Sequence, residues 1–141
     1  MGLFTEKITL KNSGDVYSAG RGYIKEEEIR QVIVDALVDS GASAMVIPET
    51  VRAELGLQLK KETEVSVVGG KLTAQVAEPV EVHWQDRMSV CTPLVIPVDM
   101  QPLLGALPME EMDIMVHPKE GRLVGAHGDK IVLYAVGVRV E

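Results

Sequence analysis

The segment Ala36-Leu37-Val38-Asp39-Ser40-Gly41-Ala42-Ser43 is the most informative in this sequence, because an apolar run there delivers one carboxylate into a short loop of small residues. An acid at the end of a buried strand costs free energy unless neighbouring groups satisfy it or chemistry uses it. Ser40 can donate or accept a hydrogen bond within the loop, and Gly41 permits close approaches that a Cβ would block. Taken alone, Asp39-Ser40-Gly41 fits either an ordinary turn after a strand or a loop that holds a reactive acid.

Length, composition and charge restrict the class of protein. The 141 residues predict a single domain over residues 1–141, large enough to bury one core. Hydrophobic residues make up 46%, which argues against disorder, and aromatic residues only 4%, so the core must be aliphatic. A formal net charge of -7, with no offsetting cluster of lysine and arginine, argues against nucleic acid as a partner.

The N-terminal segment and the cysteine content bear on the cellular compartment. Cys91 is the only cysteine, which excludes an internal disulfide framework and fits a reducing compartment. Residues 1–10 have no long apolar core, so no signal peptide is predicted, and no apolar stretch is long enough to span a membrane. We therefore expect a cytoplasmic protein without a membrane partner.

Short segments of alternating polar and apolar residues, separated by turn signals, run through most of the chain. Many short strands with close turns and one or two short helices predict a mainly β, barrel-like domain. A turn or loop is expected at residues 12–15, whereas residues 17–28 fit either a loop or an irregular strand. Strands are expected around residues 4–10, 31–38, 45–47, 62–68, 71–76, 80–84, 88–96, 113–117, 122–124 and 130–140, and helices after Pro48, ending at Gly56, and around 108–112.

Two further segments complete the pattern. Residues 62–68 and 71–76 alternate on either side of Gly69-Gly70, which predicts a hairpin because glycine supplies the positive φ of a tight turn. Leu103-Leu104-Gly105 is a second apolar stretch that ends in a glycine, and the short helix is expected soon after it.

These three features resemble, in order, the motifs of the retropepsin-like aspartic proteases. Asp39-Ser40-Gly41-Ala42 is similar to the Asp-Thr/Ser-Gly-Ala signature of that family, including its small bacterial members. The Gly69-Gly70 hairpin resembles the flap, and Leu103-Leu104-Gly105 resembles the strand that threads behind the catalytic loop. The resemblance covers about residues 30–124 and leaves a β-rich C-terminal tail at 125–141. It implies an acid-protease barrel that forms one protomer of a symmetric homodimer.

The resemblance also implies a reaction. Aspartic endopeptidases hydrolyse peptide bonds with two carboxylates that share one proton, one acting as general base on a water and the other as general acid. This sequence has one Asp-Ser-Gly motif, so Asp39 and its copy would have to meet across a two-fold axis. A peptide or protein is the expected substrate, and no cofactor is required.

The remaining motif residues receive roles from the same resemblance. Ser40 would hydrogen-bond toward the partner's loop, Gly41 would offer its carbonyl to the substrate backbone, and Ala42 would complete the catalytic loop. Gly69 and Gly70 would form a flexible flap tip that closes over the substrate. Leu104 and Gly105 would pack behind the Asp39 loop in a structural role.

The sequence departs from the retroviral pattern at two positions. Retroviral members carry an acidic residue directly after the Asp-Thr/Ser-Gly-Ala segment and an arginine directly after the later glycine, and these two residues pair. Ser43 and Ala106 stand at those positions here. Both partners of the ion pair are absent together, which moves the resemblance toward the bacterial branch.

Other interpretations of the sequence remain open. The same fold could serve as a non-catalytic dimerisation or peptide-binding module. His83, His117 and His127 lack the spacing of metal ligands, and each is expected at an exposed position, so no metal site is predicted. Gly20-Arg21-Gly22 and Gly69-Gly70-Lys71 do not contain a P-loop pattern.

Overall fold

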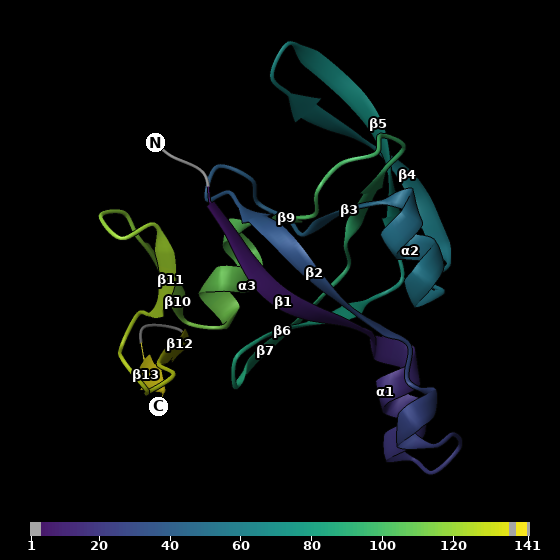
Figure 1. Cartoon of the computed structure of the whole chain (residues 1–141), viewed down its shortest axis with the longest axis horizontal. Helices are drawn as coiled ribbons and strands as arrows, with labels where there is room; N and C mark the ends of the chain where they lie inside the picture. Colours follow the sequence, from purple (N-terminus) through teal and green to yellow (C-terminus); the bar gives the residue numbers. More distant parts are fainter. Residues whose placement is uncertain (1–3, 136–137, 141) are drawn as a thin grey trace.

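A computed structural model describes residues 4–135 and 138–140, and a strongly curved nine-stranded sheet forms its body (Figure 1). The strand order is β4-β5-β8-β3-β9-β2-β1-β6-β7, and two small two-stranded sheets, β10-β11 and β12-β13, lie beside it. The elements are β1 (Phe4–Asn12), α1 (Ser13–Gly20), the 3-10 helix η1 (Glu26–Glu28), β2 (Gln31–Val38), β3 (Val46–Pro48), α2 (Glu49–Leu55), β4 (Leu59–Val67), β5 (Gly70–Ala77), β6 (Val80–Trp84), β7 (Arg87–Cys91), β8 (Leu94–Ile96), β9 (Leu103–Leu104), α3 (Ala106–Glu111), β10 (Ile114–His117), β11 (Arg122–Gly125), β12 (Leu133–Ala135) and β13 (Val138–Val140).

The predicted mainly β, barrel-like fold is confirmed. β1 pairs antiparallel with β2 along its length, from Phe4 opposite Val38 to Lys11 opposite Gln31, and also with β6. β9 inserts between β2 and β3, parallel to the former and antiparallel to the latter, with Leu104 opposite Val38. This insertion brings two segments more than sixty positions apart in sequence to the end of β2.

The core is aliphatic, as the composition predicts. Its fully buried side chains include Ile8, Leu10, Ile47, Leu55 and Leu104. Trp84 adds the one aromatic ring among the buried core residues of the described chain, and its indole Nε1 donates to Glu6 Oε1 at 3.0 Å. Glu6 Oε2 also accepts from the backbone N–H of Leu123 at 3.4 Å, so this carboxylate ties β1 to β6 and β11.

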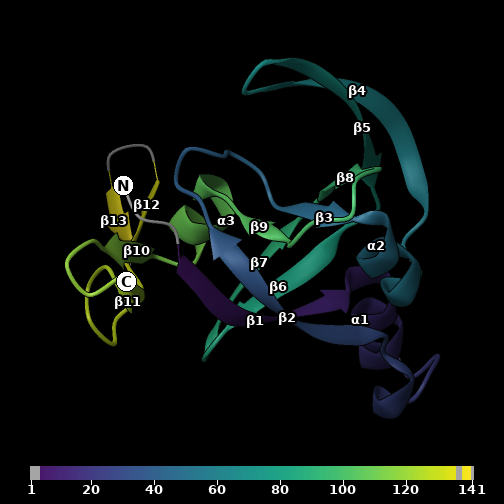
Figure 2. The same ribbon diagram turned by 45° about the horizontal axis from the view of Figure 1, so that its top comes forward.

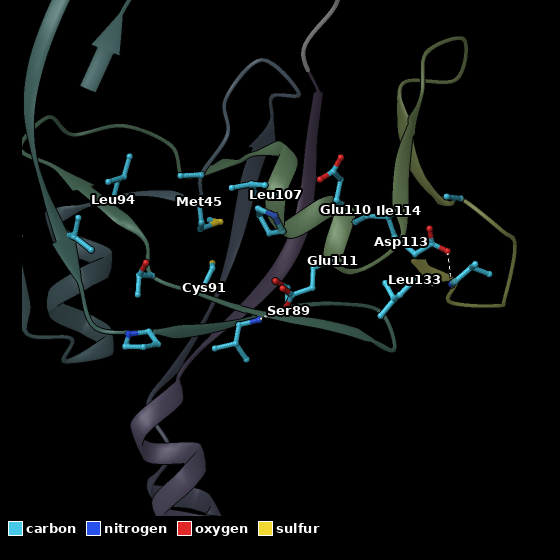
Figure 3. Close-up of a pocket in the computed structure, with 18 residues that line it drawn as sticks. Met45, Ser89, Cys91, Leu94, Leu107, Glu110, Glu111, Asp113, Ile114 and Leu133 are labelled. Atoms are coloured by element: carbon cyan, nitrogen blue, oxygen red, sulfur yellow. Dashed lines mark hydrogen bonds between the residues drawn. The ribbon is translucent and has the colours of Figure 1, made fainter. Parts of the chain in front are cut away.

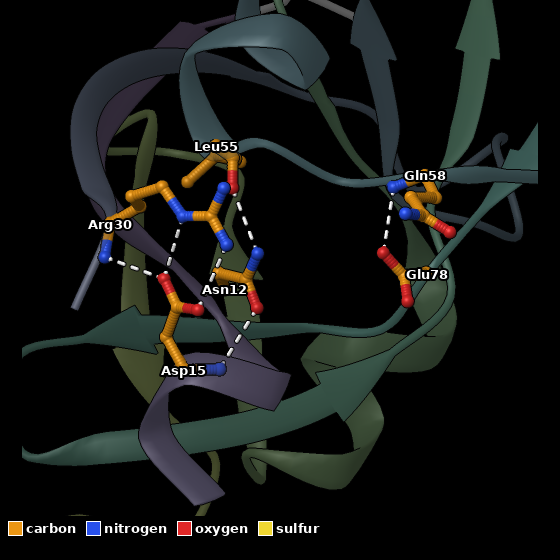
Figure 4. A network of polar contacts seen from close by, with 6 residues as sticks. All are labelled: Asn12, Asp15, Arg30, Leu55, Gln58 and Glu78. Carbon is orange, nitrogen blue, oxygen red and sulfur yellow. Dashed lines mark hydrogen bonds and ion pairs between the residues drawn. The ribbon is translucent and has the colours of Figure 1, made fainter. Parts of the chain in front are cut away.

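The turn expected at residues 12–15 was wrong, because α1 begins there. Asn12 is the N-cap: its side-chain oxygen accepts from Asp15 N at 3.0 Å, and its amide nitrogen donates to Leu55 O at 2.9 Å (Figure 4). Asx residues favour turns and helix N-caps for the same reason, since both conformations use the side-chain oxygen as a local acceptor. Residues 17–28 form the rest of α1, a loop and η1, and contain no irregular strand.

An ion pair fastens this α1 insertion to the barrel. Arg30 donates from Nε and Nη2 to the two carboxylate oxygens of Asp15 at 2.8 and 2.9 Å, and the backbone N–H of Arg30 also donates to Asp15 (Figure 4). The guanidinium packs over Gly56, where a Cβ would lie 1.9 Å from Nη1. Gly56 also ends α2 with a φ of 65°, as the sequence predicts.

Three strand predictions need correction. The hairpin turn is formed by Val68 and Gly69, because Gly70 already pairs with Val67 as the first residue of β5. The strand expected over residues 88–96 is divided into β7 and β8 at Pro93, whose ring cannot donate to a ladder. The single strand expected over 130–140 is instead a hairpin of β12 and β13, and its residues 136–137 lie outside the described part of the chain.

The start of the C-terminal segment is held by buried polar contacts. Arg87, only 5% exposed, donates from Nη1 to the carbonyls of Met112 and Asp113 at 3.1 and 2.6 Å, and from Nη2 to Gly128 O at 2.5 Å. Asp113 Oδ2 accepts from Val132 N at 2.9 Å and lies 2.8 Å from His127 Nδ1. These contacts, which we call the Asp113 clamp, fasten residues 126–132 to β7 and to the end of α3.

The histidines occupy three different settings. His127 belongs to the Asp113 clamp, His83 is half-buried beside Glu81, and His117 is partly exposed at the start of a turn. Residues 4–135 and 138–140 contain no cluster of three or more metal-ligating side chains. None of the helices in this part of the chain has the length and apolar character needed to cross a bilayer.

Replacement of Asp113 by asparagine should reveal the charge dependence of the clamp. Burial alone would raise the pKa of Asp113, but the Val132 N–H, His127 and Arg87 together hold that pKa below its ordinary value. The stabilisation is therefore complete above the ordinary aspartate pKa of about 3.9 and is lost as the pH falls through the lower folded-state pKa. We expect Asp113→Asn to lower the free energy of unfolding by about 1–3 kcal/mol near pH 7.

Urea unfolding of both proteins between pH 7 and pH 2 measures this difference. It should shrink as the pH falls below about 4, because Asp113 then becomes protonated in the unfolded chain first and in the folded protein at a lower pH. Asp86→Asn, which changes an exposed turn residue, is the control and should show little effect at any pH. A difference between wild type and Asp113→Asn that stays constant across the range would contradict a role for the charge.

Candidate active site

Asp39 stands directly after the last residue of β2, half-buried at the start of the β2–β3 connection. Its backbone N–H donates to Leu104 O at 3.0 Å, which extends the β2–β9 pairing by one bond. Its side-chain Oδ1 accepts from Gly41 N at 2.9 Å, and its carbonyl accepts from Ala42 N at 3.1 Å. The carboxylate is thereby oriented by the backbone of its own loop.

A second layer of backbone lies beneath this loop. Ala106 N donates to Ala42 O at 2.7 Å, and Leu107 N donates to Ser43 O at 3.0 Å. A Cβ on Gly105 would lie 2.2 Å from Ala44 O and 2.8 Å from Ala42 O, so no larger residue fits without movement of the loop. The start of α3 therefore supports the loop directly, through main-chain bonds that involve Ser43 and Ala106.

The structure brings Asp39, Ser40, Gly41 and Ala42 together as one loop, with Leu104 fully buried behind it. Ser40 and Gly41 are exposed and Ala42 is half-buried, so the loop presents its small residues outward. In the described part of the chain, the hydrogen bonds of Asp39 all go to backbone groups. Within residues 4–135 and 138–140, no hydrogen bond joins Asp39 to another carboxylate.

Gly69 and Gly70 lie far from this loop in sequence, at the tip of the β4–β5 hairpin. The hairpin extends away from the body of the sheet and curves toward the side on which the β2–β3 connection lies (Figure 2). Its tip is exposed, and Gly69 and Gly70 have φ values of 92° and 149°, which a side chain with a Cβ adopts only with strain. Both glycines therefore occupy positions that favour this residue type, although the turn is one residue earlier than expected.

The support of the loop by Ala106 and Leu107 was not predicted from the sequence. Both act through backbone N–H groups, which every residue except proline carries, so their side chains give no signal. Only the apolar stretch that ends in Gly105 marked this region, through the close approach that glycine allows.

Replacement of Gly105 by alanine tests how closely the two layers pack. The added methyl would overlap the carbonyl of Ala44, so the loop or the start of α3 must shift. We expect the free energy of unfolding to fall by about 1–3 kcal/mol, as in other overpacked sites. Gly20→Ala is the matched control, because nothing lies within 4 Å of a Cβ there. Equal unfolding free energies for Gly105→Ala and wild type would show that the approach is looser than described.

Comparisons with known proteins agree with this geometry. Residues 26–113, more than half of the chain, match the family described as aspartyl protease, a segment that contains the Asp39 loop, the hairpin and β9. No curated protein matches the sequence significantly. Among solved structures, the EIAV protease complexed with the inhibitor HBY-793 is similar with a TM-score of 0.53 and 16% identity, over 75% of this chain and 84% of that one.

The structural likeness concerns the fold alone, since the identity is low. The family match is independent of it, and both agree with the motif order along the chain. This chain therefore belongs to the aspartyl protease family and has the retropepsin-like fold.

Proposed function

We propose that this protein is an aspartic endopeptidase in which Asp39 and its copy in a second molecule form the catalytic pair. The observation that carries the proposal is the Asp39 loop, in which a half-buried carboxylate is oriented by Gly41 N and supported from behind by Gly105. An aspartic protease activity in general follows from the family. The assignment of that activity to Asp39 is our inference from the loop.

The proposed reaction uses one proton shared by two carboxyl groups. The ionised carboxylate takes a proton from a water molecule, and the oxygen of this water attacks the carbonyl carbon of the scissile peptide bond. The protonated carboxyl gives its proton to the leaving nitrogen, and the C–N bond breaks. The pair titrates as a unit, because two like charges at close range cannot both ionise easily.

The exposed residues of the loop support assembly as a symmetric homodimer. Ser40 and Gly41 present polar groups at the surface beside Asp39, where a copy of the same loop could approach. We assign Ser40 to the contact between the two loops, Gly41 to the substrate backbone and Ala42 to support of the loop. Gly69 and Gly70 form the flexible tip of a flap over the substrate.

Two broader assignments belong to the same proposal. Residues 1–141 form one protease domain whose core spans about 30–124, and the contacts of Glu6 and the Asp113 clamp support this, because they join both ends of the described chain to the barrel. The absence of the retroviral ion pair at Ser43 and Ala106 favours the bacterial branch, and the single Cys91 favours a cytoplasmic location.

Replacement of Asp39 by asparagine tests the catalytic assignment. Asparagine keeps the size of the side chain but cannot act as a general base, so we expect peptide cleavage to fall by at least about 100-fold. Wild type and variant are incubated with a mixed peptide library, with and without a statine-type inhibitor. Asp35→Asn, an exposed carboxylate on β2, is the control and should retain activity. Equal cleavage by wild type and Asp39→Asn would exclude the proposed mechanism, and no cleavage by either would favour the non-catalytic binding module.

The dimer is tested by sedimentation of wild type at micromolar concentration. The active species should have about twice the monomer mass of 15.3 kDa. Activity per chain should fall on dilution in parallel with the fraction of dimer. Full peptidase activity in a demonstrated monomer would be incompatible with a pair of Asp39 side chains.

Replacement of both Gly69 and Gly70 by valine tests the flap. Both positions have positive φ, so each valine adds strain of about 1–3 kcal/mol to the tip. We expect kcat/KM to fall by about tenfold or more, with little loss of global stability because the tip is exposed. Val68→Ala changes the neighbouring turn residue without adding strain and should leave turnover near the wild-type value. Unchanged kinetics in the folded double variant would show that this hairpin does not cover the substrate.

A further inference from the structure

A groove of about 1210 Å³ runs between β7 and α3 (Figure 3). Asp39, Ser40, Gly41 and the glycines of the hairpin tip do not line it. Its walls are mainly apolar and come from the strands of the sheet, from α3 and from the C-terminal segment, with Met45, Leu94, Leu107, Ile114 and Leu133 among them. The volume exceeds the range of about 300–1000 Å³ that is usual for small-molecule pockets, which suits a longer ligand.

One wall of the groove is an edge strand with outward-facing backbone groups. β7 is the last strand of the nine-stranded sheet, and residues 89–92 border the groove in succession. Val90 N donates to Glu111 Oε1 at 3.1 Å, so this N–H points toward α3 and away from β6. Because backbone groups alternate in direction along a strand, the N–H of Met88 points outward as well. An extended peptide can therefore add to this edge through main-chain hydrogen bonds.

The charge of the groove selects among possible peptides. Glu110, Glu111 and Asp113 line it, and no lysine or arginine does. The carboxylate of Asp113 already bonds Val132 N and His127. Glu110 is exposed, and the carboxylate of Glu111 accepts from the N–H of Val90 at the edge of β7. The charge of Glu111 affects Cys91, which also lines the groove. Burial first, and then the charge of Glu111, raise the pKa of the Cys91 thiol to about 11. A cationic side chain is the complementary partner for these carboxylates.

We propose that this groove is a second peptide-binding site, which takes an extended segment of a partner protein with Lys or Arg next to apolar side chains. The segment adds as a strand to the outer edge of β7, its apolar side chains contact the walls formed by Leu107 and Leu133, and its cationic side chain pairs with Glu110 and Glu111. This site adjoins the support of the Asp39 loop, since Ala44 and Leu107 belong to both, but it does not include Asp39 and does not depend on catalysis there.

Glu111 gives the site a simple selection rule. In the free protein its carboxylate occupies the Val90 N–H, which protects the edge strand from unspecific pairing. A lysine or arginine of the incoming segment attracts the carboxylate and frees this N–H for the peptide backbone. A neutral or acidic segment leaves the edge blocked by Glu111.

The test uses the Asp39→Asn protein, so that no peptide is cleaved, and a fluorescein-labelled peptide of three Lys-Val repeats. Fluorescence anisotropy measures its affinity, with a peptide of three Glu-Val repeats as the charge-reversed probe. Glu110→Gln with Glu111→Gln removes both carboxylates of the groove. Glu26→Gln with Glu27→Gln is the matched control, since these are adjacent exposed acids on η1 outside the groove.

A backbone variant provides an independent measurement. Val90→Pro removes the outward N–H, and edge strands accept proline where the N–H does not pair within the sheet. We expect the Lys-Val peptide to bind about fivefold to tenfold more weakly to this variant and to the Glu110→Gln, Glu111→Gln variant. The Glu26→Gln, Glu27→Gln control should change affinity by less than about twofold, because these exposed charges lie outside the site. The Glu-Val peptide should not bind.

The outcomes separate the proposal from its alternatives. Amide chemical shifts on addition of the Lys-Val peptide should change at residues 88–92 and 107–111. The proposal is overturned if the Glu110→Gln, Glu111→Gln protein and its Glu26→Gln, Glu27→Gln control lose affinity for the Lys-Val peptide equally. It is also overturned by unchanged affinity in a folded Val90→Pro protein, by the absence of binding, or by chemical-shift changes centred on residues 39–43. Because Asp39→Asn is used throughout, none of these results depends on whether the protein is a protease.

Discussion

The close approach of β9 to the end of β2 is the constraint on which the site depends. The bond from Asp39 N to Leu104 O continues the strand pairing into the loop, and Gly105 then lets the chain pass within contact distance of the loop carbonyls. Main-chain hydrogen bonds from the start of α3 complete the support. The carboxylate is thereby oriented by backbone groups of its own chain, which is the arrangement that the proposed general acid–base chemistry needs.

Two sets of polar contacts attach peripheral segments of the described chain to the barrel. The Asp15–Arg30 pair holds the α1 insertion, and the Asp113 clamp holds residues 126–132. The ion pair at Asp15 lies near the surface, where such interactions contribute little, whereas Arg87 is buried and bonds three carbonyls. Loss of the α1 attachment should therefore be tolerated better than loss of the clamp, because the buried guanidinium would be left without partners.

The sequence predicted those parts of the fold in which local chemistry and tertiary structure agree. The limits of β2, the position of β6 and the end of α2 at Gly56 were correct because alternation, β-branched residues and glycine act locally. α1 was missed because Asn12-Ser13-Gly14-Asp15 favours a turn and an N-cap equally, and the choice was made by Arg30 and Leu55, which are distant in sequence. The groove beside β7 could not be predicted, since strand order and the outward direction of Val90 N appear only in the folded sheet.

The mode of loop support also bears on how the site responds to its surroundings. An ion pair beneath a catalytic loop would weaken with salt and would titrate, whereas the main-chain bonds of Ala42 and Ser43 to α3 do neither. Ser43 and Ala106 are thus compatible with an ordered loop, because the geometry they need comes from the backbone. On the proposed mechanism, the pH dependence of the reaction then reports the Asp39 pair itself, and the salt dependence reports the contact between the two molecules. The two effects can be separated on this mechanism because the bonds from α3 to the loop are main-chain bonds.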